Sequence, residues 1–312
     1  MMPEPLHSYF KSRRKLVEQA LNRLLDGAEV EPALIHEAMR YSIFAGGKRL
    51  RPVLVLAAAE CCGARPETAL PTAAAMELIH TYSLVHDDLP AMDDDDLRRG
   101  RPTSHKVYGE AIAVLAGDAL LTKAFELIAG NAKIRPVKPQ IIPNLIALVS
   151  RGAGTFGMIG GQVMDIQMEG GSWLRKGRLP PSAAKARTER ILKSIHQRKT
   201  AALIRTSLQA GALLAGATPR QLSRFGDYGE KIGLAFQIAD DVLDVVADKK
   251  KLGKRGSDAK NQKLTFPALY GLEPSRRRAL ALVEEAKKAL QPFGHRAQVL
   301  KQLANYIVER DH

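Results

Sequence analysis

Apolar residues recur along most of the chain at three- and four-residue steps, which is the spacing of one face of an α-helix. This spacing predicts helices over residues 16–25, 52–62, 72–86, 111–129, 201–214 and 228–246. Several of these segments are apolar almost all round, which is typical of helices in the middle of a bundle. No stretch shows the sustained apolar–polar alternation of a strand, so no sheet is expected. The pattern predicts an all-α fold of about ten helices.

The chain carries no signal of a second domain or of a membrane span. Its 312 residues contain no fixed-period repeat and no low-complexity linker, so we expect one domain over residues 1–312. No apolar run approaches 18 residues, and residues 1–15 lack the apolar stretch of a signal peptide. The two cysteines, Cys61 and Cys62, are adjacent, which excludes a disulfide framework. These features favour a cytoplasmic protein.

Charge is distributed unevenly along the chain. The net charge is +14, and residues 171–200 hold nine Lys and Arg against one acidic residue, whereas residues 87–96 hold six aspartates and no base. An excess of positive charge favours an anionic partner such as phosphate, nucleic acid or a membrane surface. Nucleic acid is disfavoured, because aromatic residues make up only 5% of the chain and no binding motif is present. The dense acidic cluster indicates a metal ion instead.

Two aspartate clusters each follow an apolar helical run. On a helix, Asp240 and Asp244 lie about 40° apart on the same face and can share one ion. Asp87 and Asp93 are six residues apart, roughly 240° around a straight helix, and converge only if the helix bends or ends at the proline between them. Mg²⁺ prefers oxygen ligands and takes one or two carboxylates together with substrate phosphate. Two such clusters on opposing helices would hold a diphosphate through magnesium ions, or through Mn²⁺ as the alternative ion. For residues 93–96, a solvated acidic cap is the alternative interpretation.

Several basic segments are candidates for contact with phosphate. The segment Gly46–Pro52 (GGKRLRP) precedes a predicted helix, where glycines let the backbone approach an anion, although a plain turn explains it equally well. It is no Walker loop, because the required spacing is absent. Arg98 and Arg99 directly follow the acidic run and either neutralise it or bind the diphosphate. His80 lies on an apolar helix, where a satisfied core histidine is the common alternative.

The order of the motifs is more specific than any one of them. They are GGKRxRP at 46–52, HTYSLxHDD at 80–88, DDxxxxD at 87–93, LRRGxPT at 97–103, AGDAL at 116–120, GGQ at 160–162, KT at 199–200 and FQxxDDxxD at 236–244. This series strongly resembles the trans-polyprenyl diphosphate synthases, most of all the short-chain bacterial farnesyl diphosphate synthases. The resemblance covers roughly residues 30–275. It implies one helical bundle in which the two aspartate motifs face each other across a deep central cavity, and commonly a homodimer.

The resemblance also implies roles for individual residues. Isopentenyl diphosphate would be bound without metal by Gly47, Lys48, Arg51, His80 and Arg99. Magnesium would be bound by Asp87, Asp88, Asp93, Asp240, Asp241 and Asp244. The allylic diphosphate would be contacted by Arg98, Lys199, Thr200, Gln237, Lys254 and Lys263. The residues expected to carry the catalysis are Asp87, Asp93, Asp240 and Lys199.

The chemistry that the resemblance implies is ionisation, condensation and elimination. Magnesium and basic residues stabilise the leaving diphosphate of an allylic substrate, dimethylallyl or geranyl diphosphate, and isopentenyl diphosphate attacks the carbocation in a dry pocket. The family pattern places the floor of that pocket at Tyr82, five residues before Asp87, while Ser83, four before, shares the face of Asp87. An aromatic floor resembles fifteen-carbon producers. We therefore expect farnesyl diphosphate, with geranylgeranyl diphosphate as the alternative product.

Two related functions fit the sequence less well. A terpene cyclase has no need for isopentenyl diphosphate, so Gly46–Arg51 and the second aspartate motif argue against it. A non-catalytic subunit would be expected to have lost one aspartate motif, and both are intact. The basic segment 172–190 is longer than in short-chain relatives. It is interpreted as a solvated insertion, with two alternatives: a loop near the pocket mouth, or a patch for an anionic membrane surface. Membrane contact is expected to be at most peripheral.

Overall fold

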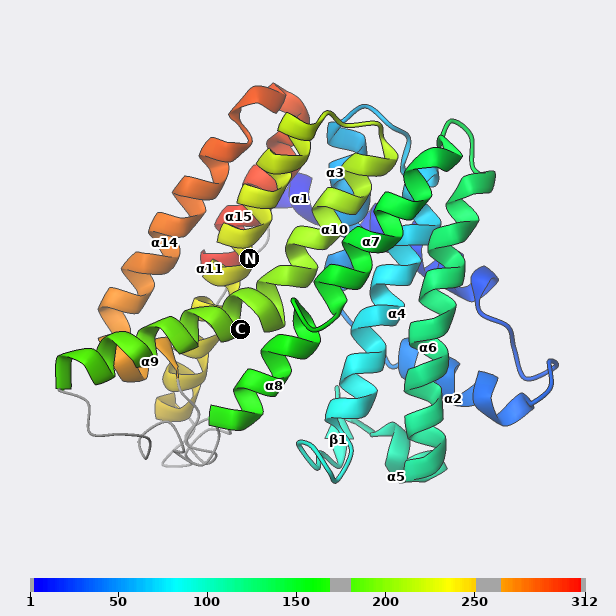
Figure 1. The fold of residues 1–312 in the computed structure, drawn as a ribbon, viewed down its shortest axis with the longest axis horizontal. Helices are drawn as coiled ribbons and strands as arrows, with labels where there is room; N and C mark the ends of the chain where they lie inside the picture. The colour runs from blue at the N-terminus through cyan, green and yellow to red at the C-terminus, as the bar shows by residue number, and fades with distance from the viewer. Residues whose placement is uncertain (1–2, 169–180, 251–264, 310–312) are drawn as a thin grey trace. The chain divides into compact units, whose positions relative to one another are not determined.

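The computed structural model describes residues 3–168, 181–250 and 265–309, which are almost entirely helical (Figure 1). The prediction of an all-α fold is confirmed. Within the described residues the extended structure is limited to strands β1 (Leu97–Arg98) and β2 (Arg101–Pro102), a two-residue antiparallel ladder. No helix among these residues is long and apolar enough to cross a membrane.

The chain divides into two compact units. We call residues 7–147 with 210–217 the N-terminal unit, and residues 1–6 with 148–209 and 218–312 the C-terminal unit. The first aspartate motif belongs to the N-terminal unit and the second to the C-terminal unit. The expectation of a single domain stays a prediction.

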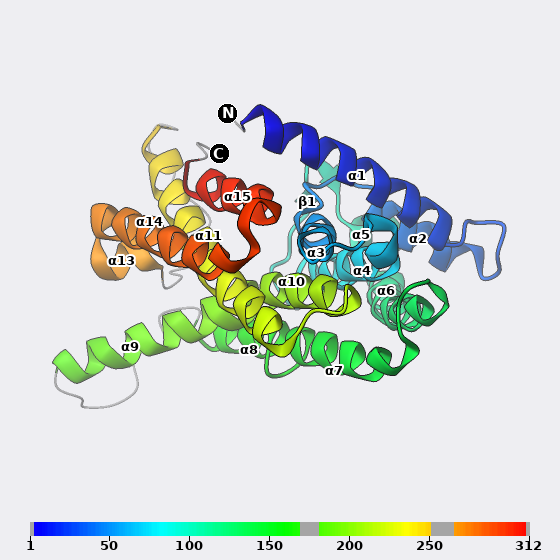
Figure 2. The ribbon, with the colours of Figure 1, turned by 90° about the horizontal axis from the view of Figure 1, so that it is seen from above.

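The N-terminal unit is built around one buried helix. Its elements are most of α1 (Glu4–Leu24), α2 (Ala33–Ile43), α3 (Leu50–Cys61), η1 (Pro66–Ala69), α4 (Leu70–Asp87), α5 (Ser104–Tyr108), α6 (Glu110–Gly130), η2 (Asn131–Lys133), η3 (Pro139–Ile141) and the first half of α7 (Ile142–Ala153). Helix α4 packs against α3 and α6, so that α3, α4 and α6 lie in a row (Figure 2). It is buried on nearly every side, as its all-round apolar sequence predicts. The first aspartate motif therefore stands at the end of a fixed helix.

The C-terminal unit is built around α11. Its elements are the second half of α7, α8 (Met158–Met168), α9 (Pro181–Ile195), the π-helix η5 (His196–Ala201), most of α10 (Ala202–Leu214), α11 (Pro219–Lys250), α13 (Phe266–Tyr270), α14 (Leu272–Ala289), η6 (Gln291–Ala297) and α15 (Gln298–Glu309). Helix α11 packs against α14, which lies beside it in Figure 1, and also against η5. Of the basic insertion 172–190, the part from Pro181 onward begins α9, and the part before it lies outside the described residues.

Candidate active site

The first aspartate motif forms a tight turn at the end of α4. The helix ends at Asp87, and the N–H of Asp93 donates to the carbonyl of Asp87 at 2.8 Å. The N–H of Asp95 likewise donates to the carbonyl of Asp88 at 3.2 Å. The chain thus folds back over the helix end and brings Asp93 beside Asp87. This is the break near Pro90 that the six-residue spacing required.

The second aspartate of this motif is held by the protein. Asp88 is only 4% exposed, and Nε of Arg98 donates to its carboxylate. Nη2 of Arg98 also donates to Asp95 at 3.0 Å. Burial raises the pKa of Asp88, and the Arg98 guanidinium opposes that rise. Arg98 therefore ties Asp88 to the turn. Asp88, predicted to bind magnesium, and Arg98, predicted to contact the allylic diphosphate, are paired with each other.

A cluster of cations surrounds His80 on α4. Burial first, and then the guanidinium groups of Arg51 and Arg99, hold the pKa of His80 well below its ordinary value. Burial also lowers the pKa of Arg51 to about 10, with Arg99 adding to the effect and Glu77 opposing it. Within the described residues, Nε of Arg51 has no hydrogen-bond partner. His80 and Arg51 are half-buried and Arg99 is exposed, so the cluster can be reached from solvent. Positive charge in excess of its counter-charge at such a place favours an anion.

The glycine loop before α3 lies against this cluster. Gly47 has a φ of +135°, and a Cβ at this position would come within 2.6 Å of Nη1 of Arg99. The same guanidinium donates to the carbonyl of Gly46, while Lys48 is exposed. A side chain at position 47 would displace Arg99. The loop thus brings the predicted residues Gly47, Arg51, His80 and Arg99 together.

Arg49, in the same loop, has a structural role that the sequence did not reveal. It is 2% exposed and donates to Glu18 at 2.8 Å, to Glu77 at 2.7 Å and to the carbonyl of Ile43 at 2.7 Å. Its φ of 52° turns the chain into α3. All the donor groups face inward, so Arg49 fixes the loop, whereas Arg51 keeps a donor unused.

In the C-terminal unit, Asp241 is held as firmly as Asp88. It is 3% exposed and accepts from Nε2 of Gln237 at 3.1 Å and from the backbone N–H of Phe266 at 3.0 Å. Thr200 donates to the side-chain oxygen of Gln237 at 2.8 Å, which fixes the Gln237 amide. Asp240 is half-buried and Asp244 is exposed on the same helix. The predicted residues Thr200, Gln237 and Asp241 thus form one chain of hydrogen bonds.

Lys199 pairs with an aspartate that the sequence prediction missed. Its ammonium donates to Asp165 at 2.6 Å. Helix α8 carries Asp165 close to η5 because Gly161 leaves room: a Cβ there would lie 2.2 Å from the backbone N of Lys199. The GGQ motif at 160–162, one helical turn before Asp165, was the available signal. Asp165 is therefore placed to orient Lys199.

His196 and Phe266 also escaped the sequence prediction. The two rings stack with centroids 5.5 Å apart, and Nε2 of His196 lies 3.8 Å from Oδ2 of Asp241. Burial lowers the pKa of His196 to about 4, so this histidine is neutral near pH 7. The His196 ring and the backbone of Phe266 thus both lie next to Asp241.

The two residues predicted to set product length have different surroundings. Tyr82 is buried, its ring lies edge-on to His86 at 5.8 Å, and its hydroxyl has no hydrogen-bond partner in the described chain. Burial, with Asp87 nearby, raises the pKa of Tyr82 to about 12. Ser83 donates to the carbonyl of His80 at 2.9 Å. Lys254 and Lys263, predicted to contact the allylic diphosphate, lie outside the described residues.

The donors of both aspartate motifs are carboxylate oxygens, which fit Mg²⁺. The turn that brings Asp93 beside Asp87 gives a pair of such donors at one helix end. Among residues 3–168, 181–250 and 265–309, no group of three or more His, Cys, Asp and Glu is arranged to hold a metal ion. A pair suffices in chemical terms, because Mg²⁺ commonly keeps waters and completes its coordination with phosphate oxygens.

Comparisons with known proteins agree with this geometry. The sequence profile of the polyprenyl synthetase family matches residues 32–305. The chain is 46% identical to a geranylgeranyl diphosphate synthase of Cyanophora paradoxa (98% of this chain, 97% of that protein) and 41% identical to a farnesyl diphosphate synthase of Bacillus subtilis (all of both chains). A solved FPP/GFPP synthase of Zymomonas mobilis superposes with a TM-score of 0.82 at 37% identity, covering 97% of this chain and 99% of the other. The chain belongs to the polyprenyl synthetase family, as its motifs predicted.

Proposed function

We propose that the protein is a magnesium-dependent prenyltransferase that condenses isopentenyl diphosphate with an allylic diphosphate. The reaction breaks the allylic C–O bond, joins the freed carbon to the terminal double-bond carbon of isopentenyl diphosphate, and releases diphosphate and a proton. The observation that carries the proposal is the cluster of Arg51, His80 and Arg99 beside the turn that joins Asp87 to Asp93. Helix α4 carries both His80, in the metal-free anion site, and Asp87, in the carboxylate pair.

The metal-free site is suited to isopentenyl diphosphate. Arg51 and Arg99 supply positive charge that the protein leaves only partly compensated. An incoming diphosphate would supply the missing acceptors for Arg51 and would favour the charged forms of these groups. Neutral His80 can donate one ring N–H to a phosphate oxygen. Binding without metal leaves this substrate intact while the other one ionises.

The allylic diphosphate is assigned to the carboxylates and to Lys199. We propose that Asp87 and Asp93 in one unit, and Asp240 and Asp244 in the other, hold magnesium. Bound magnesium supplies positive charge that stabilises the leaving diphosphate. Lys199, oriented by Asp165, adds a further positive charge to that diphosphate. Asp88 and Asp241 are proposed to act mainly by positioning, since Arg98 holds the first and Gln237 and Phe266 hold the second.

The product is proposed to be farnesyl diphosphate, with Tyr82 as the floor of the apolar pocket. A buried aromatic ring near Asp87 would stop a growing chain by occupying its path. Geranylgeranyl diphosphate stays the alternative, because relatives named for either product share more than 40% identity with this chain. A homodimer and a cytoplasmic location are further expectations from the family resemblance.

The function is tested by steady-state kinetics with both substrates. Arg51→Met should raise KM for isopentenyl diphosphate by at least about tenfold, the scale of one lost charge-assisted hydrogen bond, and leave KM for the allylic substrate nearly unchanged. Arg65→Met, an exposed arginine in the same unit, is the matched control. Asp87→Asn should abolish turnover of a folded protein, and EDTA should do so reversibly in the wild type. A mutant Asp87→Asn with near-normal kcat would contradict the assignment.

A further inference from the structure

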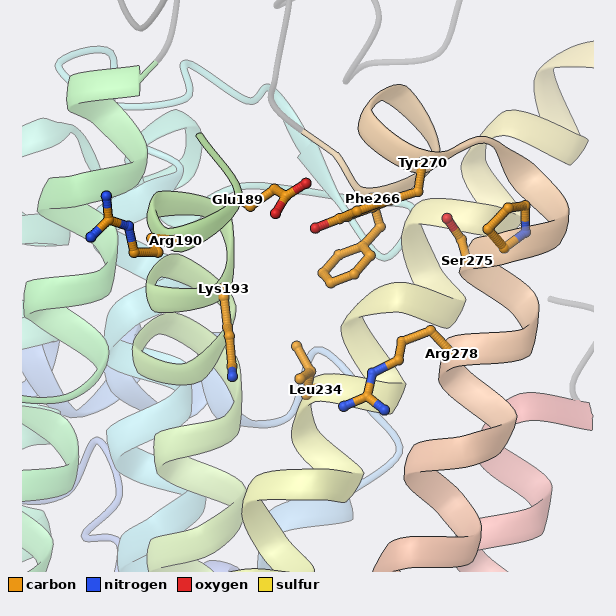
Figure 3. Close-up of a pocket in the computed structure, with 9 residues that line it drawn as sticks. Glu189, Arg190, Lys193, Leu234, Phe266, Tyr270, Ser275 and Arg278 are labelled. Atoms are coloured by element: carbon orange, nitrogen blue, oxygen red, sulfur yellow. The ribbon is translucent and has the colours of Figure 1, made fainter. Parts of the chain in front are cut away.

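A cavity lies in the C-terminal unit, next to the second aspartate motif. It has a volume of about 390 Å³ and opens between α9, α11, α13 and α14 (Figure 3). Volumes of roughly 300–1,000 Å³ are typical of small-molecule sites. Among the described residues, none of those assigned to substrates or metal lines it.

One end of the cavity is cationic and apolar. In Figure 3, Lys193 from α9 and Arg278 from α14 extend on either side of Leu234, whereas Arg190 points away from them. Within the described part of the chain Lys193 has no ion-pair partner. Arg278 meets Glu285 at 3.2 Å in an exposed pair, and such pairs contribute little. Both cations are thus available to an anion seated over Leu234.

The acidic group of the cavity is engaged at the opposite end. Glu189 points toward Tyr270 in Figure 3 and hydrogen-bonds with its hydroxyl. Burial raises the pKa of Tyr270, and the Glu189 carboxylate raises it further. Between the two ends lies the ring of Phe266. The cavity therefore offers positive charge at one end and an aromatic wall next to it.

The wall residue Phe266 also contacts the second aspartate motif. Its backbone N–H donates to Asp241 at 3.0 Å, and its ring stacks on His196. An occupant that packs against Phe266 would therefore touch the residue that anchors Asp241. Binding in the cavity and the position of Asp241 are linked through a single residue.

We propose that this cavity binds a small anionic amphiphile, a phosphate or diphosphate ester with an apolar chain. The anionic head lies between Lys193 and Arg278, and the apolar chain packs on Leu234 and Phe266. Charge-assisted hydrogen bonds to the two cations provide affinity, and the apolar wall selects esters over inorganic phosphate. An effect of the occupant on kcat, through Phe266 and Asp241, rests on the proposed function; the binding itself does not.

The test is isothermal titration calorimetry of the full chain with dodecyl phosphate below its critical micelle concentration. The double variant Lys193→Met/Arg278→Met should bind at least about tenfold more weakly than the wild type, since two charge-assisted contacts are lost. The control Arg187→Met/Arg277→Met removes the same charge from exposed positions on α9 and α14 outside the cavity. It should bind like the wild type. Inorganic phosphate and dodecanol should each bind more weakly than the ester.

A second variant separates this site from the proposed active site. Asp87→Asn/Asp240→Asn should retain dodecyl phosphate binding even where turnover is lost, so failure of the proposed function would leave this result intact. In that background, tighter binding of geranyl diphosphate than of dodecyl phosphate would identify a prenyl ester as the occupant, and equal binding would indicate phosphorylated lipids in general. Either result supports the site. Equal affinity of the Lys193/Arg278 variant and its control, with both folded by circular dichroism, would overturn it.

Discussion

Arg49 and Arg51 lie two residues apart at the start of α3, yet the structure gives them opposite roles, and this difference can be measured. Arg49 makes three hydrogen bonds to Glu18, Glu77 and the carbonyl of Ile43. Arg51 is half-buried, and its Nε has no hydrogen-bond partner among the described residues. We predict that Arg49→Met lowers stability and that Arg51→Met does not.

The size of each change in the free energy of unfolding follows from the groups that the substitution leaves without a partner. Glu77 is 1% exposed, and its Oε2 has no hydrogen-bond partner in the described residues. Arg49→Met would leave this buried carboxylate without the guanidinium that pairs with it. Breaking a buried ion pair from one side costs about 3–5 kcal/mol. Burial already lowers the pKa of Arg51, which means that its charge is unfavourable in the folded protein. Arg51→Met should therefore be neutral or slightly stabilising.

Urea unfolding of the two variants and the wild type gives the comparison, read as free energies of unfolding. A double-variant cycle sharpens it: Arg49→Met/Glu77→Gln should recover about 1–3 kcal/mol relative to Arg49→Met alone, because the uncompensated carboxylate is gone. The reasoning is refuted if Arg49→Met unfolds like the wild type. It is also refuted if the losses in free energy of unfolding caused by Arg49→Met and by Glu77→Gln simply add in the double variant.

Three further outcomes are expected. Tyr82→Ala should lengthen the product; dephosphorylation and sizing of the alcohols checks this, and an unchanged fifteen-carbon profile would contradict it. Gly161→Ala should lower both Tm and kcat because the new Cβ would lie 2.2 Å from the backbone N of Lys199, whereas Gly130→Ala, with no atom within 4 Å of the new Cβ, should do neither. The free energy of unfolding should fall as the pH drops below about 6.5, because His80 is protonated in the unfolded chain but not in the folded protein. His80→Gln should make this pH dependence shallower when urea unfolding is measured at several pH values. An unchanged pH dependence in His80→Gln would contradict the role given to His80.

The helical fold was predictable because its signal is local. The all-round apolar segment at 72–86 became the central helix α4, and the proline after Asp87 marked the turn that brings Asp93 back. The start of α9 was harder to predict from the sequence. Pro181 follows a Gly- and Pro-containing stretch that favours a break, and a proline at the first helical position begins a helix as readily as it interrupts one.

The candidate site was predictable only in its motif residues. The partners of Arg49, Glu18 and Glu77, lie 31 and 28 residues away in the sequence, so no local spacing reveals the pairing. The same holds for Asp165, which meets Lys199 across 34 residues. The chemical type and spacing of the motif residues indicate what they can bind. The residues that orient them come from distant segments of the chain, so only the folded structure identifies them.

Product analysis tests the central claim most directly. The protein is incubated with Mg²⁺, isopentenyl diphosphate and dimethylallyl diphosphate, and the dephosphorylated alcohols are then sized. The account predicts farnesol as the main product, and none when EDTA is present. Geranylgeraniol would retain the prenyltransferase but contradict Tyr82 as the pocket floor. No condensation product from folded protein with Mg²⁺ present would contradict the proposed function itself.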